Sequence, residues 1–380
     1  MQLFANARLF LPGSFAAGSF SVRGERFERF FPDAFPNQAD HMPRVDLRGA
    51  TVLPGLVDIH THGNSGADCS DGSPEGLRTM AAYLARHGVT SFAPTTMTLP
   101  YEALSAAFAA IRKLYDSRPE DCARVAGIHM EGPFLSNAKR GAQSAAYLRS
   151  PDAAAFRALS EGCGGLIRLV DVAAELEGAA AFAALASKLC TVSVAHTDAD
   201  YEQAGSVFDA GARHLTHLFN AMPPLLHRAP GVIGAASERE AVTAELICDG
   251  LHVHPSAVRA AFRLFPGRIC LISDALRCCG MPDGAYELGG QTVVLNHGAA
   301  RLADGTLAGA AVHLLDGLRN AVRFGIPEAE AVRAATLLPA RVIGMEREIG
   351  SLERGKFADF LVCDREYRLK SVYLGGRKLL

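Results

Sequence analysis

Short apolar runs that suit buried strands alternate with helical patterns through the middle of the chain. The clearest helical pattern starts at Ser73, a capping residue followed by a proline that suits the first helical position. Apolar residues then recur at helical spacing from Leu77 to Leu84, and Gly88 ends the pattern. Eight apolar runs have the length and composition of strands: residues 57–61, 89–94, 125–130, 167–171, 191–195, 214–218, 243–248 and 269–273.

Eight strands separated by helical segments predict an α/β fold, a (β/α)8 barrel of TIM type, rather than an open doubly wound sheet. No Gly-x-Gly-x-x-Gly or Walker-type loop follows a strand, which disfavours a nucleotide-binding fold. Residues 285–305 predict a β-hairpin insert after the eighth strand, because Gly289-Gly290 lies between short apolar runs. Helices predicted over 310–323 and 327–335 are expected to pack under the barrel.

The two ends of the chain share a different pattern, with short β-rich segments separated by turn residues. Residues 7–10 and 19–22 are examples, and the last part of the chain is similar. This likeness predicts that both ends pair into one small, discontinuous β-sandwich. The expected domains are residues 1–52 and 345–380 for the β-sandwich and 53–344 for the barrel.

Composition excludes several classes of protein. Apolar residues make up 49% of the chain and charged residues 21%, which supports a large core and excludes disorder. A net charge of −2 gives no general attraction to nucleic acid or to a membrane surface, so an anionic ligand must be held locally. No basic segment precedes an apolar run at the N-terminus, and no apolar stretch reaches the ~20 residues of a membrane helix. We therefore expect neither a signal peptide nor a membrane span.

The nine cysteines are odd in number and lack the spacing of a disulfide framework. This favours reduced thiols and a cytoplasmic location. Adjacent Cys278 and Cys279 cannot form a Cys-x-x-Cys motif, and packing is the simpler role for them. Their place shortly after Asp274 leaves a redox or metal-sensitivity role open.

Six polar residues lie at the carboxyl ends of the predicted strands. In a barrel these ends converge on one mouth, where catalytic side chains collect. His60 and His62 are two positions apart, so they project from the same face of a strand, as a metal-binding pair would. Each residue alone fits an ordinary core or capping role, but six at the same end predict a metal site. They are His60 and His62 on the first strand, Glu131 on the third, His196 on the fifth, His217 on the sixth and Asp274 on the eighth.

The segments that carry these residues resemble a known family. Residues 54–63, Pro-Gly-Leu-Val-Asp-Ile-His-Thr-His-Gly, are similar to the opening motif of the amidohydrolase superfamily. Residues 129–134, His-Met-Glu-Gly-Pro-Phe, and 214–222, His-Leu-Thr-His-Leu-Phe-Asn-Ala-Met, closely resemble N-acetylglucosamine-6-phosphate deacetylases. So do residues 195–197 and 272–275, and the resemblance extends over nearly the whole chain.

The resemblance implies metal-dependent hydrolysis of the acetamide of N-acetyl-D-glucosamine 6-phosphate to D-glucosamine 6-phosphate and acetate, in amino-sugar catabolism or recycling. It implies Glu131, His196 and His217 as ligands of the tighter metal. Because this chain keeps both first-strand histidines, His60 and His62 are expected to form a second site that shares Glu131. The expected cofactor is a divalent transition metal, zinc or iron, with one or two ions per subunit.

Further roles are implied position by position. Asp274 is the expected general base, which takes a proton from water and returns it to the leaving amine. Asn220 and Ala221 are expected to present amides to the sugar phosphate, and Arg228 to neutralise it. His252 is expected to hold the substrate near the reacting carbonyl.

The resemblance also implies residues in the wall of the substrate site. Gln143, beside Ala142, replaces a histidine found in some members. Because glutamine does not titrate, we expect it to bind a sugar hydroxyl or the acyl oxygen. Leu307, Ala308 and Gly309 are expected to form part of the sugar-facing wall. No functional role is expected for His41, His87, His254, His297 or His313.

Two alternatives stay open. One is a related amidohydrolase that acts on another N-acyl amino sugar phosphate or on a cyclic amide. The other is a non-catalytic barrel scaffold, which would lack metal ligands, whereas here the set is complete. The resemblance also implies a small-molecule amino sugar phosphate as substrate and a homodimer in which phosphate contacts can cross the subunit interface. From charge and hydropathy, we expect no nucleic-acid or membrane partner.

Overall fold

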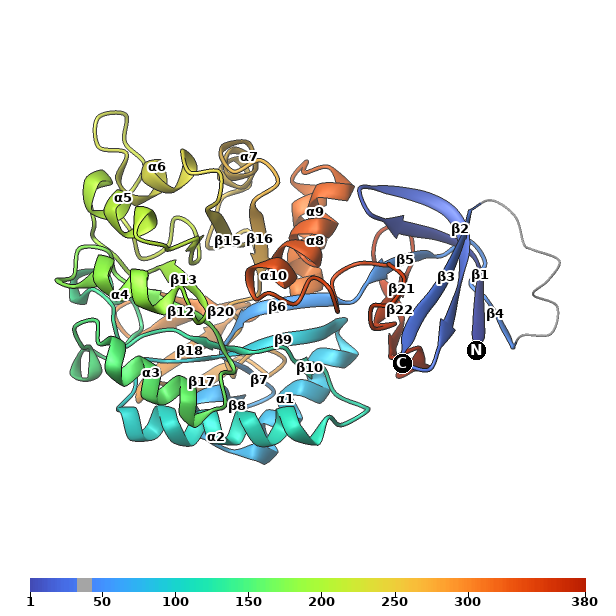
Figure 1. The fold of residues 1–380 in the computed structure, drawn as a ribbon, viewed down its shortest axis with the longest axis horizontal. Coiled ribbons are helices and arrows are strands. Elements are labelled where there is room, and N and C mark those ends of the chain that lie inside the picture. Colours follow the sequence, from blue (N-terminus) through green and yellow to red (C-terminus); the bar gives the residue numbers. More distant parts are fainter. Residues whose placement is uncertain (33–42) are drawn as a thin grey trace.

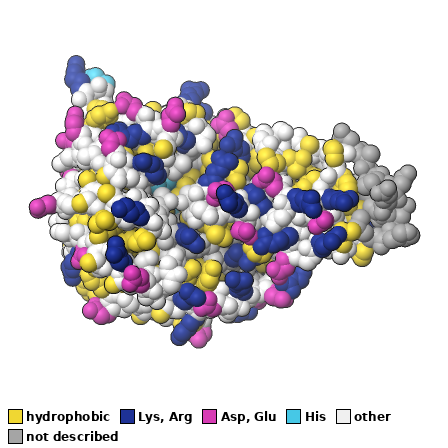
Figure 2. Space-filling view, in the orientation of Figure 1, with side chains coloured by type: hydrophobic (Ala, Val, Ile, Leu, Met, Phe, Trp, Pro, Cys, Tyr) yellow, Lys and Arg dark blue, Asp and Glu magenta, His cyan; other side chains and the backbone are white. Residues whose placement is uncertain are grey.

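The computed structural model describes residues 1–32 and 43–380, so His41 lies outside the described residues. The chain forms a barrel and a smaller sheet that holds both termini (Figure 1). Figure 2 shows side chains of both charge signs interspersed over the visible face, as a net charge of −2 suggests. None of the described helices is long and apolar enough to span a membrane.

Parallel strands in the middle of the chain form a nearly closed barrel. The first and last strands are joined by backbone hydrogen bonds from Asp274 N to His60 O and from His62 N to Ala275 O, each 2.9 Å. The predicted (β/α)8 fold is confirmed. In order of pairing, the barrel strands are β6 (Leu56–Thr61), β9 (Val89–Thr96), β11 (Ile128–Met130), β12 (Ile167–Val172), β13 (Thr191–Val194), β14 (His214–Leu215), β15 (Thr243–Ile247) and β16 (Ile269–Ile272). The short β10 (Arg124–Val125) also pairs with β9.

Helices surround the barrel. The predicted cap of the first helix is present, because Ser73 Oγ accepts a hydrogen bond from Gly76 N at 3.1 Å. Its predicted apolar face is buried. The helices are α1 (Pro74–Arg86), α2 (Tyr101–Ser117), α3 (Ala153–Gly162), α4 (Ala179–Ala186), α5 (Tyr201–Asp209), α6 (Gly231–Ser237), α7 (Pro255–Leu264), α8 (Leu314–Arg323), α9 (Glu328–Ala334) and α10 (Leu337–Val342). Short 3-10 helices cover Cys69–Asp71, Asn137–Lys139 and Ala145–Tyr147.

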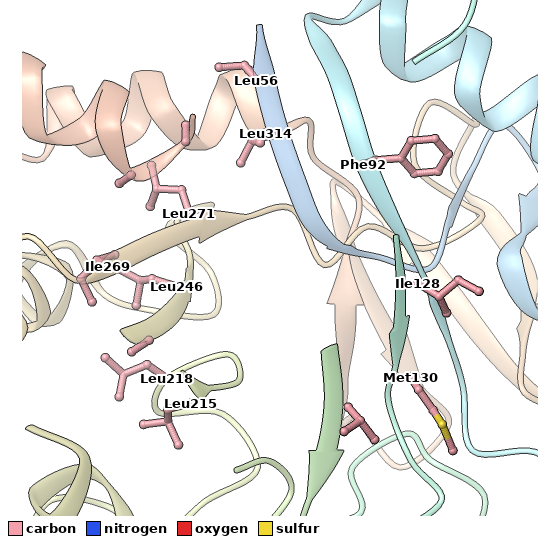
Figure 3. Close-up of a cluster of buried hydrophobic side chains, with 14 of the residues drawn as sticks. Leu56, Phe92, Ile128, Met130, Leu215, Leu218, Leu246, Ile269, Leu271 and Leu314 are labelled. Atoms are coloured by element: carbon pink, nitrogen blue, oxygen red, sulfur yellow. The ribbon is translucent and has the colours of Figure 1, made fainter. Parts of the chain in front are cut away.

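The strands have two apolar faces, as expected for a parallel sheet covered by helices. On β16, Ile269 and Leu271 lie in the layer between strands and helices (Figure 3). Cys270 and Ile272 belong to an inner cluster, together with Leu338 of α10. The barrel therefore has a packed interior beneath its mouth.

Strands from both termini join in one sheet. Leu361 in β21 (Phe360–Cys363) pairs with Leu53 in β5 (Thr51–Pro54), which links the end of the chain to its beginning. Phe4, Phe20 and Phe360 pack in the core of this sheet. The predicted domain from both termini is thus present, as one continuous sheet; its boundaries at residues 52 and 345 stay predictions. The other strands are β1 (Gln2–Leu11), β2 (Ser14–Arg23), β3 (Arg26–Pro32), β4 (Arg44–Asp46), β22 (Leu369–Leu374) and β23 (Arg377–Lys378).

The insert after the eighth barrel strand is larger than the predicted hairpin. It is a four-stranded antiparallel sheet, in which the turn at Asp304-Gly305 adds a second pair of strands. Ala310 belongs to the last of these strands, so the helix predicted from residue 310 begins at Leu314. The strands are β17 (Gly284–Leu288), β18 (Gln291–Asn296), β19 (Ala299–Leu302) and β20 (Leu307–Ala310), and β7 (Gly63–Asn64) pairs separately with β8 (Ala67–Asp68).

Candidate metal centre and substrate cavity

The structure brings the six predicted strand-end residues together at the barrel mouth. We call Glu131, His60, His62, His196, His217 and Asp274 the mouth cluster. All six are buried. Glu131, His196 and His217 form one group able to hold a metal ion, and His60, His62 and Asp274 form another.

The two groups meet at the carboxylate of Glu131. Glu131 Oε1 lies 3.1 Å from His196 Nε2 and 3.3 Å from His217 Nε2. Glu131 Oε2 lies 3.2 Å from His62 Nε2. His60 Nε2 lies 3.6 Å from Oε1, so Oε1 faces three histidines and Oε2 faces His62. Both histidine groups therefore approach the same carboxylate, as ligands around a shared carboxylate would.

Asp274 faces the first-strand histidines. Its Oδ1 atom lies 3.5 Å from His60 Nε2 and 3.3 Å from His62 Nε2. Burial by itself raises the pKa of Asp274, but His60 and His62 outweigh it and lower that pKa below its usual value. The carboxylate is thus ionised and able to accept a proton.

Backbone conformation aims three of these side chains. His196, His217 and Asp274 follow strands β13, β14 and β16 with φ values of 41°, 30° and 48°. Residues other than glycine seldom adopt this left-handed conformation, which costs about 1–3 kcal/mol and tends to occur at functional sites. It also explains why β14 ends at Leu215, although a strand was predicted to Leu218.

The hydrogen bonds of the imidazoles show that a cation fits between them. Nδ1 of His60 contacts Glu245 Oε2 at 2.8 Å, Nδ1 of His62 contacts Thr95 O at 3.2 Å, and Nδ1 of His196 contacts Lys139 O at 2.8 Å. These oxygens only accept, so each Nδ1 carries hydrogen. In the neutral rings, each Nε2 then directs a lone pair at other acceptors, which a metal ion satisfies. His217 is the exception, because its buried Nδ1 has no hydrogen-bond partner within the described residues.

Protons compete for the same lone pairs. Burial by itself lowers the pKa of His60, but the charges of Glu245, Asp274 and Glu131 outweigh it and raise that pKa to about 10. The ring thus gains a positive charge where no metal supplies one. Metal binding must displace such protons, as is general for histidine sites.

Glu245 supports the cluster from below and was missed in the sequence. Besides His60, it accepts hydrogen bonds from His214 Nε2 at 3.2 Å and from the backbone N of His217 at 3.2 Å. Burial by itself raises the pKa of Glu245, but His60 and His214 lower it well below its usual range. The signal was a charged residue inside the apolar run 243–248.

A second buried pair supports the first strand. His129 Nε2 lies 3.1 Å from Asp171 Oδ1, and His129 Nδ1 lies 3.0 Å from Ile59 O. Although His129 forms a further metal-capable group with His60 and Glu245, both of its nitrogens are engaged by protein oxygens. We interpret it as a structural neighbour of the cluster.

A cavity of about 330 Å³ opens above the mouth cluster. His252 borders it with a buried Nε2 that has no hydrogen-bond partner among the described residues, while its Nδ1 is held by Asp249 Oδ2 at 2.7 Å. Such an atom is free to bind a ligand. The other predicted residues that line the cavity are Glu131, His62, His196, His217, Asp274, Ala142, Gln143, Asn220, Ala221, Leu307, Ala308 and Gly309.

Gly309 brings the cavity wall close to Asp274. Its φ is 48°, and a Cβ atom there would lie 2.9 Å from Asp274 O and 2.7 Å from a methyl group of Leu276. Only glycine allows this approach. Leu307 and Ala308 also line the cavity, and their contact with a sugar stays a prediction.

Two of the predicted site residues do not line the cavity. His60 lies within the cluster but not in the cavity lining. Arg228 is exposed on the loop before α6, with its Nη1 atom 2.8 Å from His227 Nε2, and it does not line the cavity. A phosphate role for Arg228 therefore requires movement of the loop or a neighbouring subunit.

Cys278 and Cys279 lie outside the mouth cluster. Both are buried, and burial raises the pKa of Cys278 to about 11 and that of Cys279 to about 12. High pKa values are typical of unreactive structural thiols. Cys279 Sγ contacts His313 Nδ1 at 3.8 Å, which agrees with packing.

Comparisons with known proteins agree over most of the chain. The model of the amidohydrolase family matches residues 51–379. The N-acetylglucosamine-6-phosphate deacetylase of Vibrio furnissii is 35% identical, over 89% of this chain and 85% of that enzyme. The N-acetylgalactosamine-6-phosphate deacetylase of Escherichia coli is 36% identical, over 88% and 89%. A mutant N-acetyl-D-glucosamine-6-phosphate deacetylase from Mycobacterium smegmatis, solved in complex with N-acetyl-D-glucosamine-6-phosphate, has a TM-score of 0.93 at 31% identity and covers 100% of this chain and 99% of that one.

Replacing Glu245 by alanine should lower the free energy of unfolding of the metal-free protein by about 3–5 kcal/mol, because His214 and His60 lose their buried carboxylate. Urea unfolding in a chelating buffer, followed by circular dichroism, measures this. The exposed Glu177→Ala is the matched control, with an expected change within about 0.5 kcal/mol. Equal effects of the two changes would contradict the supporting role of Glu245.

Proposed function

The chain belongs to the amidohydrolase family, and we propose that it removes the acetyl group of N-acetyl-D-glucosamine 6-phosphate by metal-dependent hydrolysis. The products are D-glucosamine 6-phosphate and acetate, in amino-sugar catabolism or recycling. The mouth cluster carries the proposal, because its imidazole and carboxylate atoms converge on two metal-capable groups beneath the cavity. The complete ligand set disfavours a non-catalytic scaffold.

Glu131, His196 and His217 are the proposed ligands of the tighter ion, and His60 and His62 are those of a second ion that shares Glu131. A divalent zinc or iron ion bound there supplies a Lewis acid for the acyl oxygen and acidifies water. The approach of His196 to Oε1 and of His62 to Oε2 supports a Glu131 carboxylate shared between the two ions.

Asp274 is the proposed general base. Its ionised carboxylate lies at the cavity lining, and its backbone N is held by His60 O at 2.9 Å. It accepts a proton from the attacking water and donates it to the leaving nitrogen, which departs as the amine. His252 Nε2 orients the substrate, and Asn220 and Ala221 contact its phosphate.

A homodimer is proposed as well. Leu225 and Leu226, beside Arg228, and Leu251, beside His252, are 45–53% exposed. The loop before α6 stands out from the barrel (Figure 1). A second copy that covers these leucines would bring Arg228 toward a partner's cavity. A cytoplasmic location is proposed because all nine cysteines are free thiols.

The acyl-sugar preference is tested with a panel of substrates. Since one similar relative is an N-acetylgalactosamine-6-phosphate deacetylase, the panel includes both 6-phosphates and both unphosphorylated sugars. We expect kcat/KM for N-acetylglucosamine 6-phosphate to exceed that for N-acetylglucosamine by about 10–150-fold, the value of a charged hydrogen bond of roughly 1.5–3 kcal/mol. Arg228→Ala should remove most of this difference. Equal hydrolysis of both sugars by the wild type would contradict the phosphate assignment.

Asp274→Asn should lower kcat by about 10²–10⁴-fold, because the amide cannot take the proton of the attacking water. Metal content should stay at the wild-type level, measured on the same sample by atomic emission. Loss of the metal together with activity would instead make Asp274 mainly a ligand.

The double change His60→Ala and His62→Ala should reduce bound metal from two ions per subunit toward one. His196→Ala or His217→Ala should remove activity, because each takes a ligand from the tighter ion. Unchanged stoichiometry in the double variant would contradict the two-ion assignment.

A further inference from the structure

Gln143 is held by protein on both sides of its amide. Its Oε1 atom accepts a hydrogen bond from Thr98 N at 2.7 Å, and its Nε2 atom donates to Glu131 Oε2 at 2.6 Å. A backbone N–H only donates, so the amide oxygen must face Thr98 and the amino group must face Glu131. The residue is only 3% exposed, although it borders the cavity.

This contact falls on one particular oxygen of Glu131. Oε1 faces His196 and His217, with His60 Nε2 at 3.6 Å, whereas Oε2 faces His62 and Gln143. A carboxylate oxygen has two lone pairs, so donation from Gln143 leaves one for another partner. The amide therefore fixes the rotation of the carboxylate so that Oε2 faces His62.

Residues 95–98, at the end of β9 and just after it, orient both sides of this arrangement. Thr95 O accepts from His62 Nδ1 at 3.2 Å, and Thr98 N holds Gln143. The fit is close, because a Cβ atom on Gly132, the residue after Glu131, would lie 2.2 Å from Thr98 Oγ1. One short segment thus positions His62 directly and Glu131 through Gln143.

We propose that Gln143 is a positioning residue for Glu131, which keeps Oε2 directed at His62 in the second metal site, rather than a residue that binds the sugar. The inference rests on the proposed two-ion centre. It replaces the expectation of a substrate contact, because the amide oxygen and one amide hydrogen are already bound by protein.

The test is a zinc titration of metal-free protein against a chromogenic chelator. In Gln143→Leu, which has similar volume and no donor, the second ion should bind about 10–100-fold more weakly, the usual effect of losing a partner of a metal ligand. The affinity of the first ion should change by less than about threefold, because the imidazoles of His196 and His217 still face Oε1. Retained binding of the first ion also shows that the metal centre of the variant is folded. Gln143→His, which restores a donor, should bind the second ion more tightly than Gln143→Leu.

Kinetics separate this role from substrate binding. With zinc in excess, Gln143→Leu should keep KM within about threefold of the wild type, whereas Asn220→Ala should raise KM and leave zinc affinity unchanged. Wild-type zinc affinity for both ions in Gln143→Leu, or a large rise in its KM at saturating zinc, would overturn the inference. So would a wild type that takes up one ion. Failure of the wild type to deacetylate the sugar phosphate would defeat the proposed function alone, because the titration does not use substrate.

Discussion

The carboxylates of Glu131, Asp274 and Glu245 are buried beside five imidazole rings, and their charge must be balanced locally. Water cannot screen it, and buried unpaired charge is costly. Nδ1 donors bound to fixed oxygens leave the Nε2 atoms of His60, His62 and His196 as acceptors, so balance requires protons or a metal cation. The barrel supplies this environment because parallel strands direct their carboxyl ends to one mouth.

Rigid packing beneath the cluster maintains its strained geometry. Three residues of the cluster hold left-handed backbone conformations at a cost of about 1–3 kcal/mol each. The packed inner cluster around Ile272 and Leu338 and the buried pairs of Glu245 and Asp171 oppose relaxation. The side chains therefore point at one another before any ligand arrives, which is the condition for efficient metal-assisted chemistry.

Strand-end chemistry was readable in the sequence, whereas the supporting contacts were not. His60, Glu131 and Asp274 follow apolar runs, and the barrel rule alone brings them together. Glu245 and Thr95 lie within strands β15 and β9. Their roles depend on the direction in which the Glu245 side chain and the Thr95 carbonyl point, which the sequence pattern does not give. The predicted hairpin is a four-stranded sheet in the structure, because Asp304-Gly305 is a turn that connects β19 to β20. Each of these strands has only four residues, too short for a clear alternating pattern. The amide orientation of Gln143 depends on Thr98, a contact across 45 residues that periodicity does not reveal.

The same charges constrain where a phosphate can bind. A phosphate near Glu131 and Asp274 would meet two carboxylates, so the two ends of the substrate must be separated, with the acyl group at the cluster and the phosphate at the rim. Lys139 borders the cavity, but its Nζ atom already pairs with Asp198 Oδ1 at 3.3 Å. Arg228 is exposed beyond the lining. Among the described lining residues, Lys139 is the one Lys or Arg side chain, and it is already paired, so the proposed phosphate site is best completed by the protruding loop of the proposed second copy.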